Sequence, residues 1–315
     1  MSAAGAGGAA LALALVSIGG AAPLGPGTLA LRVDPSFAAA TRVFGDAGAA
    51  RLTVAELSGD RTGNAGWARG ALALGAAWAP RTGVRLEARL PLVLATSWRE
   101  ARDSLSGAHV ATEHRTSFGL GDVEVAALAA LWRGGLPGGL AAIDGGLWLS
   151  APTGRPAALV PTDDGMVEAG PLVRAFLPLG TVALGAEALW RVRPAGRPDR
   201  LVARATIGLA PAGAPWAVAV GARADLAIGR GRADSPVPAL ESADGFAPDP
   251  APIFASTAPA RARLDATAGA VLRAGPLVLG AEVAVALWGR TDAAGAALSA
   301  FAELRTPSPG SRPSP

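Results

Sequence analysis

Apolar and polar residues alternate one by one along many stretches of this chain. In residues 84–92 the apolar side chains occupy the even positions, while Arg85, Glu87 and Arg89 occupy odd positions between them. The same period of two recurs in residues 200–210, 215–229, 262–274 and 276–288. A strand turns successive side chains to opposite faces, whereas a helix with these residues would spread its charges over every side. The pattern therefore predicts strands with one apolar and one polar face.

About twelve such segments follow Arg51, most of them close to the 9–11 residues of a tilted transmembrane strand. We predict strands at residues 51–58, 67–79, 84–93, 118–132, 140–150, 167–177, 181–193, 200–210, 215–229, 262–274, 276–288 and 296–305. The connections alternate between short turns, such as 80–83 and 178–180, and long loops, such as 94–117 and 230–261. Transmembrane barrels have short periplasmic turns, long extracellular loops and an even strand count. The fold class predicted is therefore all-β, a transmembrane antiparallel up-and-down β-barrel of about 12 strands.

The eight tryptophans lie at or near the ends of the predicted strands. Three fall at predicted periplasmic ends, Trp78, Trp132 and Trp216, and five at predicted extracellular ends, Trp67, Trp98, Trp148, Trp190 and Trp288. An indole ring is apolar but carries one N–H donor, so it favours the boundary between membrane and water. The positions predict two girdles at the membrane interfaces, the alternative being core tryptophans at the mouths of a soluble barrel.

Charged strand positions are candidates for the lining of a pore. Hydrocarbon offers no water to backbone N–H and C=O groups, so strands cross a membrane only in a closed barrel. Apolar faces then meet lipid, and polar faces meet the lumen. The residues predicted to line it are Arg85, Glu87, Arg89, Asp122, Glu124, Glu187, Arg191, Arg204, Arg223, Asp225, Arg263, Asp265 and Glu282. Because both signs occur, the sequence leaves open whether the lumen conducts or is filled by ion pairs.

Composition agrees with an exported barrel. Half of the 315 residues are hydrophobic and mean hydropathy is +0.35, yet the longest apolar run after the N-terminus is only Val125–Trp132, too short for a helical span. The absence of cysteine excludes disulfides, cysteine zinc sites and thiol catalysis. The 28 basic residues are all arginines spread along the chain, and the net charge is only +3, so no clustered patch predicts nucleic-acid binding.

The N-terminal region predicts export. Residues 9–18 form an apolar core of signal-peptide length, although no charged residue precedes Thr28. We predict a signal peptide at 1–22, a periplasmic or lumenal segment at 23–50, the barrel at 51–305 and a flexible tail at 306–315. The alternative for the first residues is an alanine-rich leader or a misassigned start. These segments place the protein in the outer membrane of a Gram-negative bacterium, with membrane lipid as its expected partner.

No catalytic, metal or cofactor site is predicted, and the protein is not expected to be an enzyme. His109 and His114 fall in the predicted loop 94–117 near Asp103 and Glu113, too few ligands for a structural zinc site. A Ser-His-acid lipase would need a histidine on a strand beside a serine, and neither histidine lies on a predicted strand. The acidic residues of loop 230–261 could bind calcium, but their proline-rich spacing favours an exposed loop.

Several motifs resemble one family of Gram-negative outer-membrane barrels, transporters of the phenol meta-pathway type. Residues 117–132, SFGLGDVEVAALAALW, resemble its GLGD-led strand, with ARLPL before it at 88–92 and WLSAPTG after it at 148–154. Residues 167–192 resemble the following hairpin, and the order of elements agrees over 67–305. The resemblance implies a barrel that takes up hydrophobic or aromatic compounds. In such barrels a terminal aromatic usually ends the last strand, whereas here Phe301 is followed by the tail TPSPGSRPSP.

Two functions fit these observations. The first is a channel or transporter for small solutes, which the resemblance suggests to be hydrophobic or aromatic. The second is a structural or surface-binding barrel without conductance, and a soluble or helical envelope protein is the alternative to both. Neither the solute nor the oligomeric state follows from the sequence.

Overall fold

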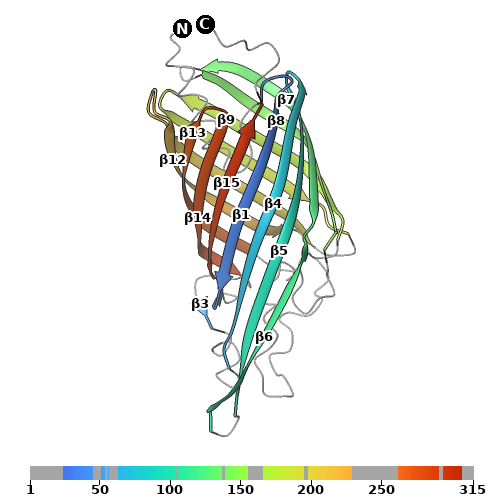
Figure 1. Ribbon diagram of the computed structural model, residues 1–315, viewed down its shortest axis with the longest axis vertical. Coiled ribbons are helices and arrows are strands. Elements are labelled where there is room, and N and C mark those ends of the chain that lie inside the picture. Colours follow the sequence, from blue (N-terminus) through green and yellow to red (C-terminus); the bar gives the residue numbers. More distant parts are fainter. Residues whose placement is uncertain are drawn as a thin grey trace.

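The computed structural model describes residues 24–44, 51–53, 56, 63–103, 106–136, 139–154, 166–194, 198–228, 262–290 and 294–306. They form one large antiparallel wall and one small hairpin (Figure 1). The strands of the wall are β1 (Leu29–Ala40), β4 (Ala65–Arg81), β5 (Val84–Arg102), β6 (His109–Leu120), β7 (Val123–Leu136), β8 (Gly139–Ala151), β9 (Glu168–Leu179), β10 (Val182–Arg191), β11 (Asp199–Leu209), β12 (Trp216–Ile228), β13 (Ala262–Ala274), β14 (Leu277–Arg290) and β15 (Ala296–Arg305). The hairpin consists of β2 (Val43–Phe44) and β3 (Arg51–Leu52).

The wall closes on itself. From β7 to β15 each strand pairs with the next, β15 returns to β1, β1 pairs with β4, and β4 pairs with β5. Strands β6 and β7 both pair with β5, β6 along residues 92–102 and β7 along 84–89, so they form one stave interrupted at Gly121–Asp122. The result is a closed antiparallel barrel of twelve staves, which confirms the predicted fold class. Within the described ranges, no helix is long and apolar enough to cross a membrane.

The first stave differs from the prediction. Residues 51–58 were expected to begin the barrel and 23–50 to lie outside its wall, but β1 at 29–40 occupies that position, registered with β4 and β15. Its apolar side chains alternate with Arg32, Asp34 and Ser36 as in every other stave. Pro35 obscures the pattern, because proline removes a ladder donor and argues against a central strand. Arg51 and Leu52 pair instead with β2.

Other parts of the predicted division fall partly or wholly outside the described residues. The predicted signal peptide at 1–22 lies outside them, as do residues 307–315 of the predicted tail. Thr306 still belongs to the wall, since its amide donates to the Leu29 carbonyl at 2.9 Å. The loop predicted at 230–261 also lies outside the described residues.

The predicted loop 94–117 is mostly strand. Strand β5 continues to Arg102 and β6 begins at His109, so the two form a long hairpin that extends beyond the barrel at the end opposite the short turns (Figure 1). Both histidines therefore lie on a strand, which corrects their predicted placement in a loop. Alternation of charged and apolar residues is weaker in 94–117 than elsewhere, because polar threonine and serine occupy both faces of these strands.

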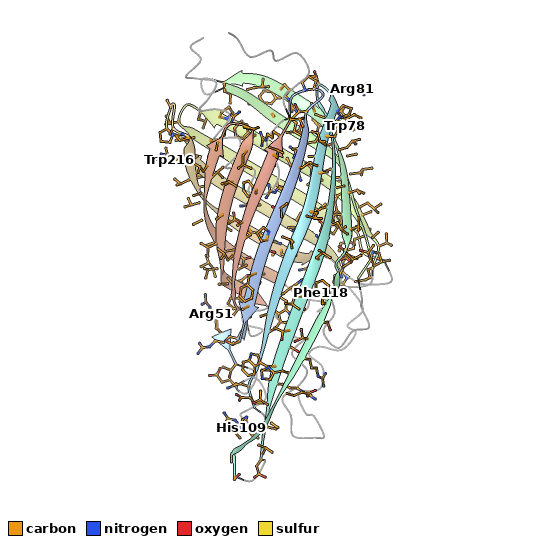
Figure 2. The ribbon with its side chains drawn as sticks, in the orientation of Figure 1. Arg51, Trp78, Arg81, His109, Phe118 and Trp216 are labelled. Atoms are coloured by element: carbon orange, nitrogen blue, oxygen red, sulfur yellow. The ribbon has the colours of Figure 1, made fainter. Side chains whose placement is uncertain are left out.

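The turns at the other end are short, as predicted. Gly83 and Gly180 adopt φ of 75° there, a left-handed conformation that glycine reaches without steric cost. Arg81 and the start of β12 mark this end in Figure 2. Ala30 pairs with Arg305, so β1 starts and β15 ends at this same rim. We call it the turn end, and the opposite rim the loop end.

Candidate functional site in the barrel lumen

Inner and outer faces of the wall have opposite chemistry. The outer face exposes large apolar side chains on every stave, including Leu31, Leu74, Leu147, Val220 and Leu298. The intervening positions carry charges, and several of these pair between staves that are not neighbours in the wall. Such pairs can form only across the concave side, where side chains converge. The charged face is therefore the lumenal face.

All the strand-borne residues predicted to line a pore lie on this face. They are Arg85, Glu87, Arg89, Glu124, Glu187, Arg191, Arg204, Arg223, Asp225, Arg263, Asp265 and Glu282, while Asp122 occupies the break between β6 and β7. Arg85, Glu87 and Arg89, the residues that defined the expected polar face, do not point outward. That these residues line an open pore remains a prediction.

One row of registered charges crosses half of the wall. Residues that pair across neighbouring strands point to the same face, so a row of paired residues forms a band inside the barrel. The band runs over six consecutive staves through Asp144, Arg174, Glu187, Arg204, Arg223 and Asp265. We call these six residues the charged band.

Arg174 is the centre of the first connection across the lumen. Its Nε donates to Glu187 on the neighbouring stave at 2.5 Å, and its Nη1 donates to Glu87 at 2.7 Å. Glu87 lies on β5, separated from β9 by β7 and β8, so the bond spans the lumen. Arg85 approaches the same carboxylate with its Nε at 2.5 Å. Ion pairs in a low-dielectric interior persist only with good geometry and further hydrogen bonds, and this cluster supplies both.

Arg204 makes the second connection. It is registered directly opposite Arg223, an arrangement that would repel, but Glu282 of β14 forms an ion pair with Arg204 across the two intervening staves. Shorter-range pairs accompany it, Arg200 with Asp225 at 2.7 Å and Arg263 with Asp265 at 2.5 Å. The two connections brace the barrel from opposite sides.

A third cluster lies nearer the loop end. The Arg191 guanidinium lies 4.6 Å from the centroid of the Trp148 ring and 3.3 Å from Glu168. Arg193 pairs with the same Glu168 at 2.7 Å, and Arg89 pairs with Glu124 at 3.6 Å. Trp148 is only 7% exposed and faces the lumen. The prediction that it belongs to a membrane-interface girdle is therefore wrong.

A layer of apolar side chains lies between the charged band and the turn end. Its buried members are Phe176, Ala183, Ala210, Ala217, Ala219, Val271, Val278 and Phe301. Phe301 packs its ring over Gly280, where any Cβ would collide with it, and the Arg32 guanidinium stacks on the ring at 4.0 Å from its centroid. We call these eight residues the apolar layer. It fills lumen that the sequence suggested would be polar.

Water nevertheless reaches the lumenal face. The Arg89 side chain keeps 44% of its accessible surface although it points inward. Arg223 of the charged band is likewise exposed. Charged groups are fully buried only when paired, so the exposure of these two arginines shows that the inner face is not closed to solvent. Ion pairs therefore cross the lumen, but they do not exclude water from it.

Five of the eight tryptophans lie exposed on the outer face, Trp78, Trp132, Trp190, Trp216 and Trp288. Trp78 and Trp216 lie near the turn end in Figure 2, and Trp132 near the β7–β8 turn. Trp98 covers Gly66 on the outer face of the projecting hairpin. Trp67 packs against buried Val93 and Ala95 on the inner face, so its predicted place in a girdle is also wrong. A membrane-interface role for the others remains a prediction.

Sequence reasoning missed several residues of the lumenal network. Arg32 and Glu303 approach to 3.9 Å across the β1–β15 junction, and Arg174, Glu168 and Arg200 hold the clusters described above. The signal was present, because Glu168, Leu172 and Arg174 share one parity along β9. Apolar residues on both faces of β9 conceal that parity.

The projecting hairpin carries a half-buried ion-pair cluster of its own. Glu113 accepts hydrogen bonds from Arg99 Nε at 2.6 Å and Arg115 Nε at 2.8 Å, and the bonds from Arg115 and Arg99 lower the pKa of Glu113 below its ordinary value. His109 Nε2 lies 2.8 Å from Thr112 Oγ1. In the described part of the chain, no group of three His, Cys, Asp or Glu residues could hold a metal ion.

Comparisons with known proteins identify the fold. The sequence matches no protein-family model and no curated protein. The structure is similar to the crystal structure of the COG4313 outer membrane channel from Pseudomonas putida F1, with a TM-score of 0.59 and 13% identity over 90% of this chain and 97% of that chain. This is an outer-membrane β-barrel fold.

More distant likenesses include the translocator domain of autotransporter NalP from Neisseria meningitidis, with a TM-score of 0.43 and 10% identity over 88% of each chain. Another is the TodX deltaS2S3 mutant monoaromatic hydrocarbon channel, with a TM-score of 0.37 and 7% identity over 90% of this chain and 91% of that chain. These values are too low to carry an argument. The specific resemblance to barrels of the phenol meta-pathway type remains a prediction.

Proposed function

We propose that this protein is an outer-membrane channel for small solutes. The observation that carries the proposal is a closed wall whose lumenal arginines, Arg89 and Arg223, stay accessible to water while the outer face is apolar. A transmembrane barrel needs an apolar outer belt that contacts lipid and a polar interior that contacts water. The fold shared with an outer-membrane channel supports the same proposal.

The solute is small because the lumen is divided. The two ion-pair connections, Arg174 with Glu87 and Arg204 with Glu282, cross the interior at the level of the charged band. The apolar layer then narrows the path toward the turn end. A barrel of this size lies between those filled by side chains and those with wide aqueous channels.

The same obstacles favour a second candidate, a structural or surface-binding barrel that does not conduct. Phe176 and Phe301 retain only 2% and 4% of their accessible surface, so the apolar layer is tightly packed. Under this candidate the ion pairs serve only to hold the wall together, and the projecting hairpin contacts a partner.

Planar-bilayer recording separates the two candidates. The purified barrel, whose closure is first checked by heat-modifiable migration on a gel, is added to a bilayer in potassium chloride. We expect stepwise current increments from a channel. A Phe301→Ala variant should give larger steps, because the ring occupies the lumen. Insertion that leaves both proteins silent would contradict the channel and support the structural barrel.

Membrane placement has its own test. Fractionation of a Gram-negative host that expresses the chain should recover it with outer-membrane markers and in a form that resists urea extraction. Recovery in the soluble fraction would contradict the proposal.

A further inference from the structure

The lumenal carboxylates and the lumenal arginines differ in how completely they are paired. Glu87, Glu187, Asp144, Asp265 and Glu282 each lie within 4.0 Å of an arginine. The arginines are not all matched in return. Among the residues that the structure describes, Arg223 has no carboxylate within 4.0 Å, and it is exposed.

The cluster nearer the loop end is also rich in arginine. Glu124 lies within 4.0 Å of both Arg89 and Arg191, and Glu168 lies within 4.0 Å of both Arg191 and Arg193. The approach of Arg191 to Glu124 is a loose 4.0 Å, and its guanidinium stacks on Trp148 instead. A solute that enters from the loop end therefore passes these arginines before it reaches Arg223.

A pocket continues the series at the turn end. It has a volume of about 470 Å³ and is lined by Leu24, Gly25, Thr28, Arg273, Pro276 and Arg305 among others. Arg305 pairs with Glu303 at 2.5 Å, whereas the exposed Arg273 has no carboxylate within 4.0 Å among the described residues and donates to the Gly275 carbonyl at 3.3 Å. This volume suits a small molecule, and its lining combines apolar carbons with one unmatched guanidinium.

We propose that the lumen selects small organic anions, carboxylates that carry an apolar body, with Arg223 and Arg273 as successive contacts along the path. The inference rests on the proposed channel function and names its substrate class. Arginine matches a carboxylate with two parallel hydrogen bonds, and rings of arginine or lysine select anions in other pores. The apolar lining of the pocket that contains Arg273 suits the hydrocarbon part of the same solute.

The charge arrangement also explains why cations are disfavoured. Each of the three carboxylates of the charged band pairs with an arginine, so the band itself offers no unpaired carboxylate to a passing cation. Unmatched positive charge in a narrow lumen raises the local concentration of anions and lowers that of cations.

The test is the zero-current potential of single channels in a potassium chloride gradient. We expect chloride to be more permeant than potassium in the unmodified protein. Removing one lumenal charge with Arg223→Gln should lower the chloride-to-potassium permeability ratio about tenfold, because one unit charge at roughly 6 Å in water changes the occupancy of each ion about threefold and in opposite directions. Arg223→Lys, which keeps the charge, should retain the ratio.

Arg81→Gln is the matched control. Arg81 is exposed at the β4–β5 turn, near the same rim as Arg273 but outside the pocket, so its loss changes net charge equally without touching the path (Figure 2). The permeability ratio should stay unchanged in this variant.

A second recording replaces chloride with benzoate. The unmodified channel should carry benzoate current, and Arg273→Gln should reduce that current severalfold relative to the chloride current. Channels that conduct but prefer potassium, or that ignore both Arg223→Gln and Arg273→Gln, would overturn the anion inference and leave the proposed function intact. A protein that inserts without current steps would overturn both.

Discussion

The charged band and the apolar layer occupy neighbouring levels of one lumen, yet they are held together by different forces. The apolar layer contains no charged or polar member, so its contribution to stability follows mainly the apolar area that it buries. The charged band depends on matched pairs, and removing one partner leaves the other charged and desolvated. The apolar layer should therefore be destabilised mainly by the loss of side-chain volume, and the charged band mainly by the loss of one partner of an ion pair.

Removing Arg174, the centre of the charged band, should lower the free energy of unfolding more than any other substitution considered. Arg174→Ala leaves Glu87 and Glu187 without their shared guanidinium, and loss of one partner from a buried ion pair costs about 3–5 kcal/mol. We expect the unfolding transition in detergent to move to lower urea concentration accordingly, as followed by heat-modifiable migration.

Arg223→Ala is the control for that experiment. It removes an arginine from the same band, but one that has no carboxylate within 4.0 Å among the described residues. Its stability should stay within about 0.5 kcal/mol of the unmodified protein, as for a surface substitution. Equal destabilisation by the two variants would show that the ion pairs do not brace the lumen.

Removing the main ring of the apolar layer should cost less free energy. Phe301→Ala takes a side chain that is 4% exposed out of its contacts with Gly280 and Arg32, which by analogy with core substitutions costs about 3 kcal/mol. Phe37→Ala is the matched control, because Phe37 lies 53% exposed on the outer face. A comparable loss of stability in both variants would contradict a packed layer in the lumen.

Four of the six residues of the charged band were predicted from the sequence, whereas the packing of the apolar layer was not. Alternation placed Arg85, Glu87 and Arg204 on the inner face correctly, because one shared parity marks a whole strand. Phe301 shares that parity with Glu303, so alternation alone places it inside the lumen. Its packing on Gly280 depends on the register between β14 and β15, which no local pattern encodes.

The same limit explains the errors in the wall. Strand β1 was not predicted because of Pro35. Apolar and polar residues alternate regularly in β1 only if Pro35 is counted as one of the apolar positions. Trp148 was assigned to the outer face from its position near a strand end, but its neighbours Leu147 and Leu149 have the opposite parity and are the exposed ones. Position along a strand sets the level of a side chain, whereas only parity sets its face.

The projecting hairpin extends the comparison to ion pairs that are partly accessible to water. Loss of these pairs should have the smallest effect on stability. Hydrogen bonds from Arg115 and Arg99 lower the pKa of Glu113, so the carboxylate stabilises the hairpin when ionised. A lowered pKa in the folded state gives stability that is present above the ordinary pKa of about 4.3 and is lost as pH falls through the folded pKa. Amide exchange in residues 109–116, corrected for intrinsic rates, should therefore accelerate slightly on acidification below about pH 4.

Glu113→Gln separates this effect from general acid loosening. The amide keeps the size of the side chain but does not titrate in this range, so exchange in the hairpin should lose its dependence on acid. Because the Glu113 side chain keeps 34% of its accessible surface and water partly screens its bonds, we expect a far weaker response than the loss of Arg174 produces inside the barrel. An acid response that persists unchanged in Glu113→Gln would mean that the ion pairs of the hairpin contribute nothing, and that only burial makes such pairs structurally important in this protein.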